Sequence, residues 1–427
     1  MHIYFSGIGG AGIGPLAQIA HQAGYEVSGS DQQSSQYVDY LRKHGFKNIH
    51  IGQSVEEISK IHTQKPIDWF VYSSSLSADH PELAFCRQQG IKTSKRDELL
   101  NRIIADKNLK LIAVAGTHGK TTTTAMVIWL FKQLGVPVSY SVGAKLSFGD
   151  MGHYEPDSEY FVYEADEFDR NFLAFEPDVS LITGVSWDHH EIFPTRDDYR
   201  AAFKDFTSQS RHTIMWQEDA DYLELQQSTD CTVMNWEDNR QVLTVKGFYN
   251  RLDAWLAVET VHWITDAAEA SLIDSVNSFP SLSRRMEELI PGLFSDYAHT
   301  PEKIKGAMSV AGEMAAETGQ KLAVVYEPLT NRRQHHMMDD YKDVFAGADK
   351  LYWIPSYLAR EDPSQRVIEP SELIAKLDDP SIASAMKRDA QLKQAIQKHL
   401  ADGDMVVAMA GGGGDSLDDW LRREFLK

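Results

Sequence analysis

Three apolar segments of this 427-residue chain end in glycine-rich turns, and each turn leads into a helix-compatible segment. They begin at residues 2, 109 and 404 and read "HIYFSGIGGAG", "LKLIAVAGTHGK" and "DMVVAMAGGGGDS". A strand that passes directly into a helix is the repeating unit of parallel α/β sheets. Strand-like and helix-like runs alternate along the rest of the chain as well. The pattern therefore predicts separate α/β domains with mostly parallel sheets.

The length exceeds the roughly 100 to 200 residues of an ordinary domain, so we expect more than one hydrophobic core. A charged polar stretch, "IADKNLK", precedes the second glycine-turn segment. In "VNSFPSLSRR", Pro280 and several serines interrupt a helical pattern. These breaks predict three domains, at residues 1–107, 108–281 and 282–427.

Composition excludes several classes of protein. With 42% hydrophobic and 24% charged residues, the chain is typical of soluble globular proteins. Its longest apolar run, "AMVIWLF", is too short to cross a bilayer, so we expect no membrane span. The N-terminus lacks a signal-like pattern, and the two cysteines form no disulfide framework, which favours a cytoplasmic location. A net charge of -20 argues against nonspecific nucleic-acid binding.

The first glycine turn has the pattern G-x-G-x-x-G between a strand and a helix, and Asp31 closes the next strand. Such turns let the backbone approach a diphosphate, and the acid holds a ribose hydroxyl. A dinucleotide and a UDP-sugar satisfy these groups equally, and a tight turn without a ligand has the same sequence. Serines in "YSSSL" end a further strand. The candidate substrate residues are Gly7, Ile8, Gly9, Gly10, Asp31, Ser73 and Ser74.

The second glycine turn is a shortened phosphate loop. Only two residues separate Gly116 from Gly119-Lys120-Thr121, whereas the usual loop has four in this place. Backbone N–H groups at the helix start, the lysine ammonium and a hydroxyl that ligates Mg²⁺ would hold the phosphates. His118 either contacts phosphate or shapes the turn. The candidate nucleotide-binding residues are Gly116, Thr117, His118, Gly119, Lys120, Thr121 and Thr122.

Acidic residues and histidines end two later strands of the same predicted domain. "SEYFVYEADEFD" ends in several carboxylates, and "VSLITGVSWDHH" ends in Asp188, His189 and His190. A carboxylate about 4 Å from a phosphate charge is repelled by about 4 kcal/mol at an effective dielectric constant near 20, and a bound cation reverses that sign. The pattern predicts a Mg²⁺ site formed by Thr121, Glu164 and His189.

These motifs resemble those of the Mur ligases of peptidoglycan synthesis. "GTHGKTTTT", "EADE", "DHH", "SRRMEE" and "DYAHTP" occur in that family's order, and the likeness spans essentially the whole chain. With "GIGGAG" at the N-terminus, the chain looks most like the branch that joins L-alanine to UDP-N-acetylmuramate. The resemblance implies an N-terminal Rossmann-like domain for the UDP-sugar, a central P-loop ATPase domain with a mostly parallel sheet, and a C-terminal Rossmann-like domain for the amino acid.

The resemblance also implies a reaction and the residues that perform it. ATP would phosphorylate the muramyl carboxylate, and an amine would then attack the acyl phosphate. Lys120, Glu164, His189 and His299 would be catalytic, with Mg²⁺ bound by Thr121, Glu164 and His189. Asn250 would contact adenine, Arg285 the phosphates and Asp296 the ribose. Lys204 lies near a lysine that is carbamylated in some branches.

The chain departs from the family pattern at two places. The adenine motif G-x-H-N-x-x-N reads "GFYNRLD", which replaces the histidine by Tyr249 and the last asparagine by Asp253. In the amino-acid pocket His299 and Arg333 match, whereas Thr300 and Thr330 do not. "EPLTN" and "DHHEIFP" are more similar to the relative that attaches a preformed tripeptide to the same UDP-sugar, which is the alternative to L-alanine.

Two other classes of protein remain open from the residues alone. An NAD-dependent dehydrogenase would use "GIGGAG" and Asp31, but it leaves the phosphate loop without a role. A nonenzymatic ATP-gated binding module would use the loop, but not His299 and Arg333. We expect a monomer or a homodimer.

Overall fold

The computed structural model describes residues 1–73, 76–189, 192–226, 228–236, 243–280, 282–358, 361, 364–412 and 414–426. The chain forms two compact units. The first contains residues 1–243 and 252–279, and the second contains residues 244–251 and 280–427. Among the described residues, no helix is both long enough and apolar enough to cross a membrane.

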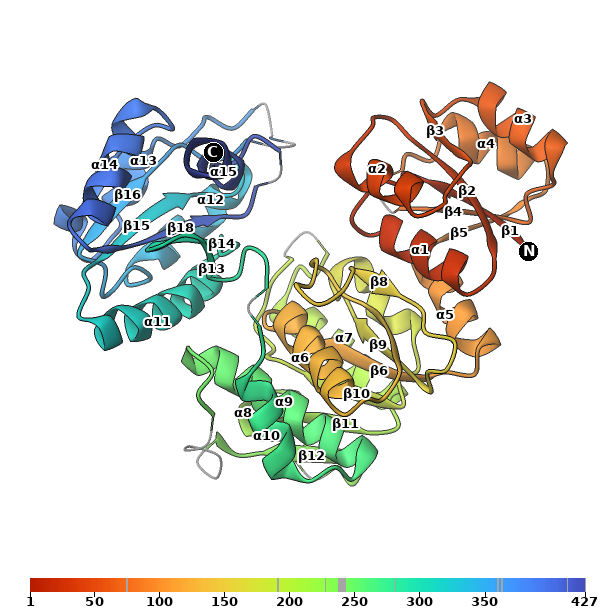
Figure 1. Ribbon diagram of the computed structural model, residues 1–427, viewed down its shortest axis with the longest axis horizontal. Helices are drawn as coiled ribbons and strands as arrows, with labels where there is room; N and C mark the ends of the chain where they lie inside the picture. Colours follow the sequence, from red (N-terminus) through yellow and green to blue (C-terminus); the bar gives the residue numbers. More distant parts are fainter. Residues whose placement is uncertain are drawn as a thin grey trace. The chain divides into compact units, whose positions relative to one another are not determined.

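The first sheet of the first unit is parallel, with strand order β3-β2-β1-β4-β5. Helices pack on both of its faces, because Ile3 and Phe5 point into one core cluster while Tyr4 and Phe70 point into another (Figure 1). This is a Rossmann-like order, in which ligands bind beyond the carboxyl ends of the strands. The elements are β1 (His2–Ser6), α1 (Gly14–Gln22), β2 (Glu26–Asp31), α2 (Gln36–Lys43), β3 (Ile49–Ile51), α3 (Val55–Gln64), β4 (Trp69–Tyr72), α4 (Pro81–Gln88), β5 (Lys92–Lys95) and α5 (Arg96–Asp106).

The second sheet of the same unit has the order β12-β11-β10-β6-β9-β7-β8, and only its edge strand β8 is antiparallel. Strand β6, which feeds the phosphate loop, lies between β10 and β9. The elements are β6 (Lys110–Ala115), α6 (Lys120–Gln133), β7 (Val138–Ser141), β8 (Gly152–His153), β9 (Tyr160–Glu164), the 3₁₀ helix η1 (Phe168–Ala174), β10 (Val179–Ile182), α7 (Arg196–Gln209), β11 (Thr213–Trp216), α8 (Gln217–Leu223), β12 (Cys231–Met234), α9 (Phe248–Thr265) and α10 (Glu269–Asn277). The first residues of α9, up to 251, belong to the second unit.

The two sheets of the first unit share one hydrophobic core. The same cluster contains Ile103 of α5, Phe161 of β9 and Phe172 of η1. Polar contacts cross the junction as well, since Gln18 donates to Asp150 at 3.1 Å and Asn101 donates to the Ala174 carbonyl at 2.7 Å. The carboxyl end of the first sheet is thereby held beside the phosphate loop of the second.

The second unit contains a six-stranded sheet of order β13-β14-β18-β15-β16-β17, in which β13 is antiparallel to β14 and the other pairs are parallel. The predicted fold class, α/β domains with mostly parallel sheets, is confirmed. The elements are β13 (Glu287–Ile290), β14 (Leu293–Asp296), α11 (Pro301–Thr318), β15 (Leu322–Glu327), α12 (Asn331–Met337), η3 (Met338–Tyr341), β16 (Lys350–Trp353), α13 (Pro370–Ile374), η4 (Pro380–Ile382), β17 (Ala383–Ala385), α14 (Ala390–Ala401), β18 (Met405–Ala410) and α15 (Leu417–Phe425).

Candidate active site

The phosphate loop joins β6 to α6 through backbone conformations that favour glycine. Gly116 has φ +149° and Gly119, which caps α6, has φ +78°. A Cβ on Gly116 would lie 2.3 Å from Thr183 Oγ1, and one on Gly119 would lie 2.5 Å from Asp253 Oδ1. The loop therefore has no room for side chains at these positions. The free N–H groups at the start of α6 form a site suited to phosphate, so the loop fits a nucleotide.

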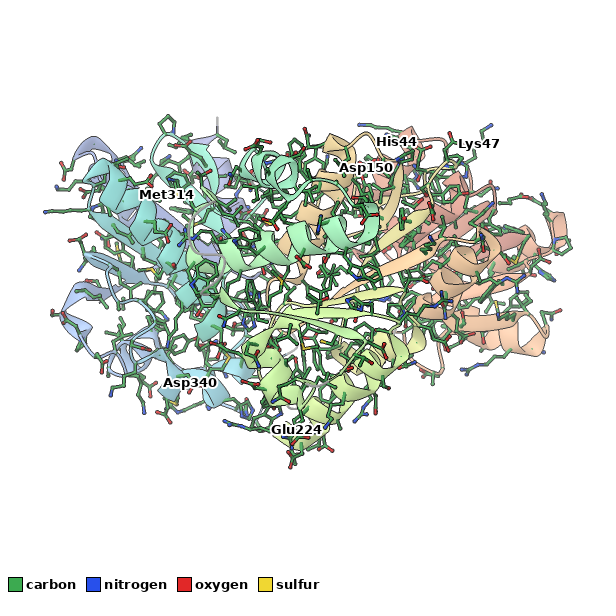
Figure 2. All side chains as sticks on the ribbon, turned by 90° about the horizontal axis from the view of Figure 1, so that it is seen from below. His44, Lys47, Asp150, Glu224, Met314 and Asp340 are labelled. Atoms are coloured by element: carbon green, nitrogen blue, oxygen red, sulfur yellow. The ribbon has the colours of Figure 1, made fainter. Side chains whose placement is uncertain are left out.

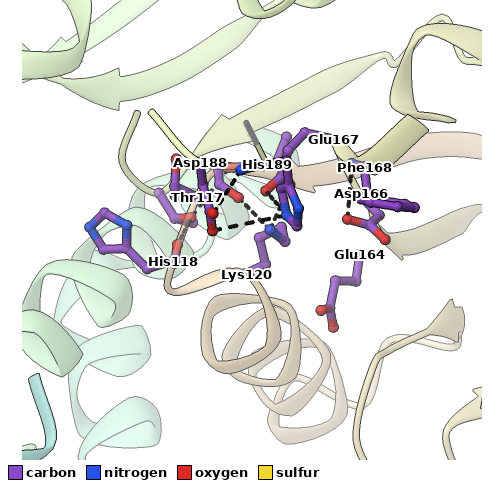
Figure 3. Close-up of polar contacts among 12 residues, drawn as sticks. Thr117, His118, Lys120, Glu164, Asp166, Glu167, Phe168, Asp188 and His189 are labelled. Atoms are coloured by element: carbon purple, nitrogen blue, oxygen red, sulfur yellow. Dashed lines mark hydrogen bonds and ion pairs between the residues drawn. The ribbon is translucent and has the colours of Figure 1, made fainter. Parts of the chain in front are cut away.

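The predicted loop residues divide into two groups. Thr117 Oγ1 donates to the Ser186 carbonyl at 2.7 Å and accepts from the Ser186 N–H at 2.9 Å, so its hydroxyl fixes the loop. The His118 ring lies against Gly184, where a Cβ would be 3.2 Å from the ring, and it points away from Lys120 (Figure 3). Lys120, Thr121 and Thr122 form the first turn of α6, where their N–H groups face the loop.

Lys120 is a buried cation with a fixed position. Its ammonium donates to Glu167 Oε2 at 2.6 Å and to the Gly116 carbonyl at 2.5 Å. Burial alone would lower the pKa of Lys120, but the carboxylates of Glu167, Asp166 and Glu164 raise it above its ordinary value. The lysine therefore stays charged at neutral pH. Glu167 is only 1% exposed, so this buried pair depends on both partners.

Glu164 and Thr121 lie together at the end of β9 and the start of α6. The Thr121 hydroxyl donates to Glu164 Oε1 at 2.8 Å, and the Gly143 N–H donates to Glu164 Oε2 at 2.6 Å. Both side chains supply the oxygen ligands that Mg²⁺ prefers. The adjacent carboxylates of Asp166 and Glu167 outnumber the lysine, so a triphosphate at this loop needs further positive charge. Mg²⁺ therefore fits this pair.

His189 lies beside Glu167, with 3.6 Å between its Nε2 and Glu167 Oε1. Its backbone has φ +53°, and the His189 N–H donates to the Asp188 carboxylate at 2.7 Å. In Figure 3 the Glu164 carboxylate points away from the His189 ring. Within the described ranges, no group of three or more His, Cys, Asp or Glu side chains is arranged to hold a metal ion. His190 lies outside the described residues.

The segment after β10 that carries Asp188 and His189 is held by Asp219 of α8, which sequence analysis missed. The Val185 N–H donates to Asp219 Oδ1 at 2.8 Å. Burial raises the pKa of Asp219 to about 6. Between about pH 4 and 6 the folded protein keeps a proton on Asp219 that the unfolded chain releases. The free energy of unfolding therefore falls as the pH rises through this range, and the full loss of stability persists above pH 6.

Asp219→Asn should therefore stabilise the protein in a pH-dependent way, because the amide keeps the Oδ1 acceptor and removes the buried charge. We expect its gain in free energy of unfolding to reach at most about 3 kcal/mol near pH 8 and to fall toward zero near pH 4. Urea unfolding at both pH values measures this. Asp221→Asn, at an exposed position of the same helix, is the control. An equal effect at both pH values would refute the explanation.

The N-terminal glycine loop lies at the carboxyl end of β1. Gly7 and Ile8 donate their N–H groups to the Ser30 carbonyl, at 2.8 and 3.0 Å. Asp31 accepts from the Gly9 N–H at 2.8 Å and from the Gln33 N–H at 3.3 Å, so it supports the loop and keeps lone pairs for a ligand hydroxyl. The Gly10 N–H donates to the Gly7 carbonyl at 2.9 Å. Ser73 follows β4, and Ser74 lies outside the described residues.

A buried carboxylate that sequence analysis missed holds the strand ends around this loop. Glu82 is fully buried and accepts from the hydroxyls of Tyr4, Ser6 and Ser30 at 2.7, 2.7 and 2.8 Å. It lies in the first turn of α4, where the helix dipole favours a negative charge. In the sequence, the only local sign of this role is that Glu82 is an acidic residue directly after a proline.

In the second unit, His299 occupies a buried and electropositive position. It is 4% exposed, and its Nδ1 lies 2.8 Å from the Tyr297 carbonyl. Burial lowers the pKa of His299 well below its ordinary value, and the charges of Lys303, Arg333 and Arg285 act in the same direction. The ring is therefore neutral at neutral pH, and the three cations suit a carboxylate ligand.

Three further residues of this unit, Asn250, Arg285 and Asp296, are predicted to contact the nucleotide. Asp296 accepts from the N–H groups of Met286 and Ala298 at 2.9 and 2.8 Å, and burial raises its pKa although Arg285 opposes the shift. The guanidinium of Arg285 lies 5.6 Å from the centre of the Tyr297 ring. Asn250 donates to the Lys246 carbonyl at 2.9 Å, and Tyr249 is 44% exposed.

Two departures from the family pattern have visible structural roles. Asp253 is 6% exposed and lies against Gly119 of the phosphate loop. Thr330 caps α12, because its hydroxyl accepts from the Arg333 N–H at 3.4 Å.

Lys204 pairs with Glu224 at 2.7 Å, and Glu224 projects from the surface (Figure 2).

Three sequence profiles match the chain. They are described as "Mur ligase family, catalytic domain", "Mur ligase middle domain" and "Mur ligase, glutamate ligase domain", and they cover residues 2–108, 114–253 and 284–412. The chain belongs to the Mur ligase family. The predicted family is thereby confirmed, and the chain is a ligase rather than a dehydrogenase or a nonenzymatic module.

Known Mur ligases resemble the chain over nearly its whole length. The UDP-N-acetylmuramate–L-alanine ligases of Clostridium acetobutylicum and Clostridium tetani are 27% and 28% identical to it, over 96% of this chain and 95% of each relative. Among solved structures, the UDP-N-acetylmuramate-alanine ligase of Thermotoga maritima shares the fold with a TM-score of 0.79, at 22% identity and coverage of 99% and 98%. A murein peptide ligase of Psychrobacter arcticus has a TM-score of 0.64, also at 22% identity and the same coverage.

Proposed function

We propose that this Mur ligase joins L-alanine to UDP-N-acetylmuramate at the expense of ATP. The γ-phosphoryl group of ATP transfers to the lactyl carboxylate, the amine attacks the resulting acyl phosphate, and the products are an amide, ADP, phosphate and one proton. The observation that carries this proposal is the buried Lys120 at the start of α6, 2.6 Å from Glu167, with the Thr121–Glu164 pair beside it. Relatives with this activity match 96% of the chain.

Phosphoryl transfer needs positioning and charge neutralisation more than covalent chemistry. Lys120 places a permanent positive charge at the phosphate loop, and the N–H groups of the first turn of α6 orient the phosphates. Thr121 and Glu164 would hold Mg²⁺, which neutralises negative charge on the phosphates when it is bound. Glu167 keeps Lys120 in place through one carboxylate oxygen, and the His189 ring lies 3.6 Å from the other. The same charges stabilise the oxyanion that forms when the amine attacks.

The second unit supplies the groups that suit an amino acid. Arg333 offers a planar guanidinium for the carboxylate, which lysine does not reproduce. The charges of Arg333 and Arg285 both act on His299, so these side chains make its surroundings electropositive. A neutral His299 can accept a proton, whereas a protonated one would repel the ammonium group of the incoming amino acid.

A preformed tripeptide is the second candidate acceptor. Thr330 stands where the alanine-adding pattern has a basic residue near the carboxylate of the amino acid. In this chain the Thr330 hydroxyl caps α12 instead. The "EPLTN" segment that contains Thr330 is one of the two segments that resemble the tripeptide-adding relative, and "DHHEIFP" is the other. We also propose that the enzyme is cytoplasmic and is a monomer or a homodimer.

A competition assay tests the acceptor. The protein is incubated with ATP, Mg²⁺, UDP-N-acetylmuramate and equal concentrations of L-alanine, glycine, L-serine and the tripeptide L-alanyl-γ-D-glutamyl-meso-diaminopimelate, and products are identified by mass. We expect the L-alanine product to dominate and phosphate to appear in equal amount. A dominant tripeptide product would replace L-alanine as the substrate. Phosphate release without UDP-N-acetylmuramate would contradict the proposed reaction itself.

A further inference from the structure

A pocket of about 180 Å³ lies in the first unit, between the glycine loop of the first sheet and the phosphate loop of the second. It is lined by groups from both sheets, among them Gly12, Arg96, Lys120, Gly143, Glu164 and Asp166. An acid carried by a sugar nucleotide has to reach this place, because its diphosphate belongs at the first loop and its carboxylate must meet the phosphoryl group at the second. The sequence motifs give no residue that would bind the carboxylate.

Arg96 is one of the residues that line this pocket. It opens α5 directly after β5, at the carboxyl edge of the first sheet, and its side chain is 29% exposed. A Cβ on Gly12 would lie 2.6 Å from Arg96 Nη1, so the guanidinium packs against the glycine loop itself. On its other side, Nη2 lies 3.6 Å from the carboxylate of Asp166.

The guanidinium is held without being saturated by its neighbours. Its Nε lies 3.4 Å from Asp97 Oδ1, and this separation, like the one to Asp166, exceeds the roughly 2.7 to 2.9 Å of a charge-assisted hydrogen bond. Asp97 and Asp166 keep the arginine near the pocket but leave donors for a closer anion. A planar fork of this kind matches both oxygens of one carboxylate.

The charges around the pocket also require a cation at this position. Of the described residues that line it, Arg96 and Lys120 are the basic ones, against Asp97, Glu164 and Asp166. Lys120 already donates to Glu167 at 2.6 Å. A substrate carboxylate that entered without a second cation would meet mainly like charges, and Arg96 is the positive group on the sugar-nucleotide side.

We propose that Arg96 binds the carboxylate of the sugar-nucleotide acid and positions it for phosphorylation. This assignment rests on the proposed function, which supplies the identity of the acid. Arg96 thus determines specificity, because it recognises the group that distinguishes UDP-N-acetylmuramate from a UDP-sugar without an acid. Gly12 takes part indirectly, since any side chain there would displace the guanidinium.

Calorimetric binding of two sugar nucleotides tests the assignment. UDP-N-acetylmuramate carries the carboxylate, and UDP-N-acetylglucosamine lacks it but has the same diphosphate. Arg96→Gln should weaken binding of UDP-N-acetylmuramate at least about tenfold and change binding of UDP-N-acetylglucosamine less than about twofold. Arg96→Lys should fall between Arg96→Gln and the wild type. Arg102→Gln, on the exposed face of the same helix, is the matched control and should bind both nucleotides like the wild type.

A second variant separates substrate binding from a structural role of the ion pair between the sheets. Asp166→Asn removes the charge of the carboxylate that pairs with Arg96 from the second sheet and keeps both the arginine and Asp97, so we expect unchanged or tighter binding of UDP-N-acetylmuramate. An equal loss for both nucleotides in Arg96→Gln, or the same loss in Asp166→Asn, would overturn the assignment. Wild-type protein that binds no UDP-N-acetylmuramate would reject the proposed function together with it, which distinguishes the two failures.

Discussion

Lys120→Ala should lower the rate of ATP-dependent phosphate release by about a thousandfold or more. The buried ammonium provides the fixed positive charge at the phosphate loop, and an arginine that supplies a comparable charge to the transition state is worth about 10³ to 10⁵ in the rate of phosphoryl transfer. Steady-state assays with all substrates saturating measure the effect. Lys132→Ala changes a lysine of the same helix whose ammonium binds the Phe148 carbonyl, and it should keep normal turnover.

The alanine variant also leaves Glu167 buried without its counterion, which should reduce stability by about 3 kcal/mol or more. The double variant Lys120→Met with Glu167→Gln removes both charges and should recover most of that stability. It should remain as inactive as the single variant. Near-normal turnover in either variant would contradict the role of Lys120. If the double variant regained activity together with stability, the single variant would have been inactive only because it was poorly folded.

Glu164→Gln should raise the Mg²⁺ concentration needed for half-maximal activity by about tenfold or more. The amide keeps one oxygen but loses the negative charge, and Mg²⁺ binds neutral ligands more weakly than carboxylates. The side chain should stay in place, because it can still accept from the Gly143 N–H while its amide group donates to the Thr121 hydroxyl. Titration of activity with Mg²⁺ at fixed ATP measures the change.

Glu159→Gln serves as the control for that titration. Glu159 precedes the same strand, is exposed and pairs with Lys110 at 2.5 Å. It should leave the Mg²⁺ requirement unchanged. If Glu164→Gln also left the requirement unchanged while lowering turnover, the carboxylate would act on the substrate directly and the metal would be held elsewhere.

The strand-to-helix junctions could be predicted from sequence because their signals are local. Strands β1, β6 and β18 each end within a residue of the expected glycine turn, as an apolar run followed by glycine requires. The shared core of the first unit could not be predicted in this way. The junction between the two sheets depends on contacts between residues far apart in the sequence, such as Phe161 and Ile103 in the core and the Gln18–Asp150 hydrogen bond beside it, and these leave no periodic pattern in the sequence.

In the candidate site, too, some residues could be predicted from local motifs and others could not. Lys120, Thr121 and Glu164 follow from short motifs, and the structure brings them together. The sequence did not reveal which acid pairs with the lysine, because that depends on burial: Glu167 is 1% exposed and Asp166 is 40% exposed. Arg96 has no motif at all, and only the packing of two sheets places it in the pocket.

Transfer of ¹⁸O from substrate to phosphate tests the central claim most directly. UDP-N-acetylmuramate with ¹⁸O in its lactyl carboxylate is converted by the enzyme with ATP, Mg²⁺ and L-alanine, and the released phosphate is examined by mass. Activation of the carboxylate at the Lys120 loop predicts one ¹⁸O atom in each phosphate formed with product. Product formation with unlabelled phosphate would contradict it.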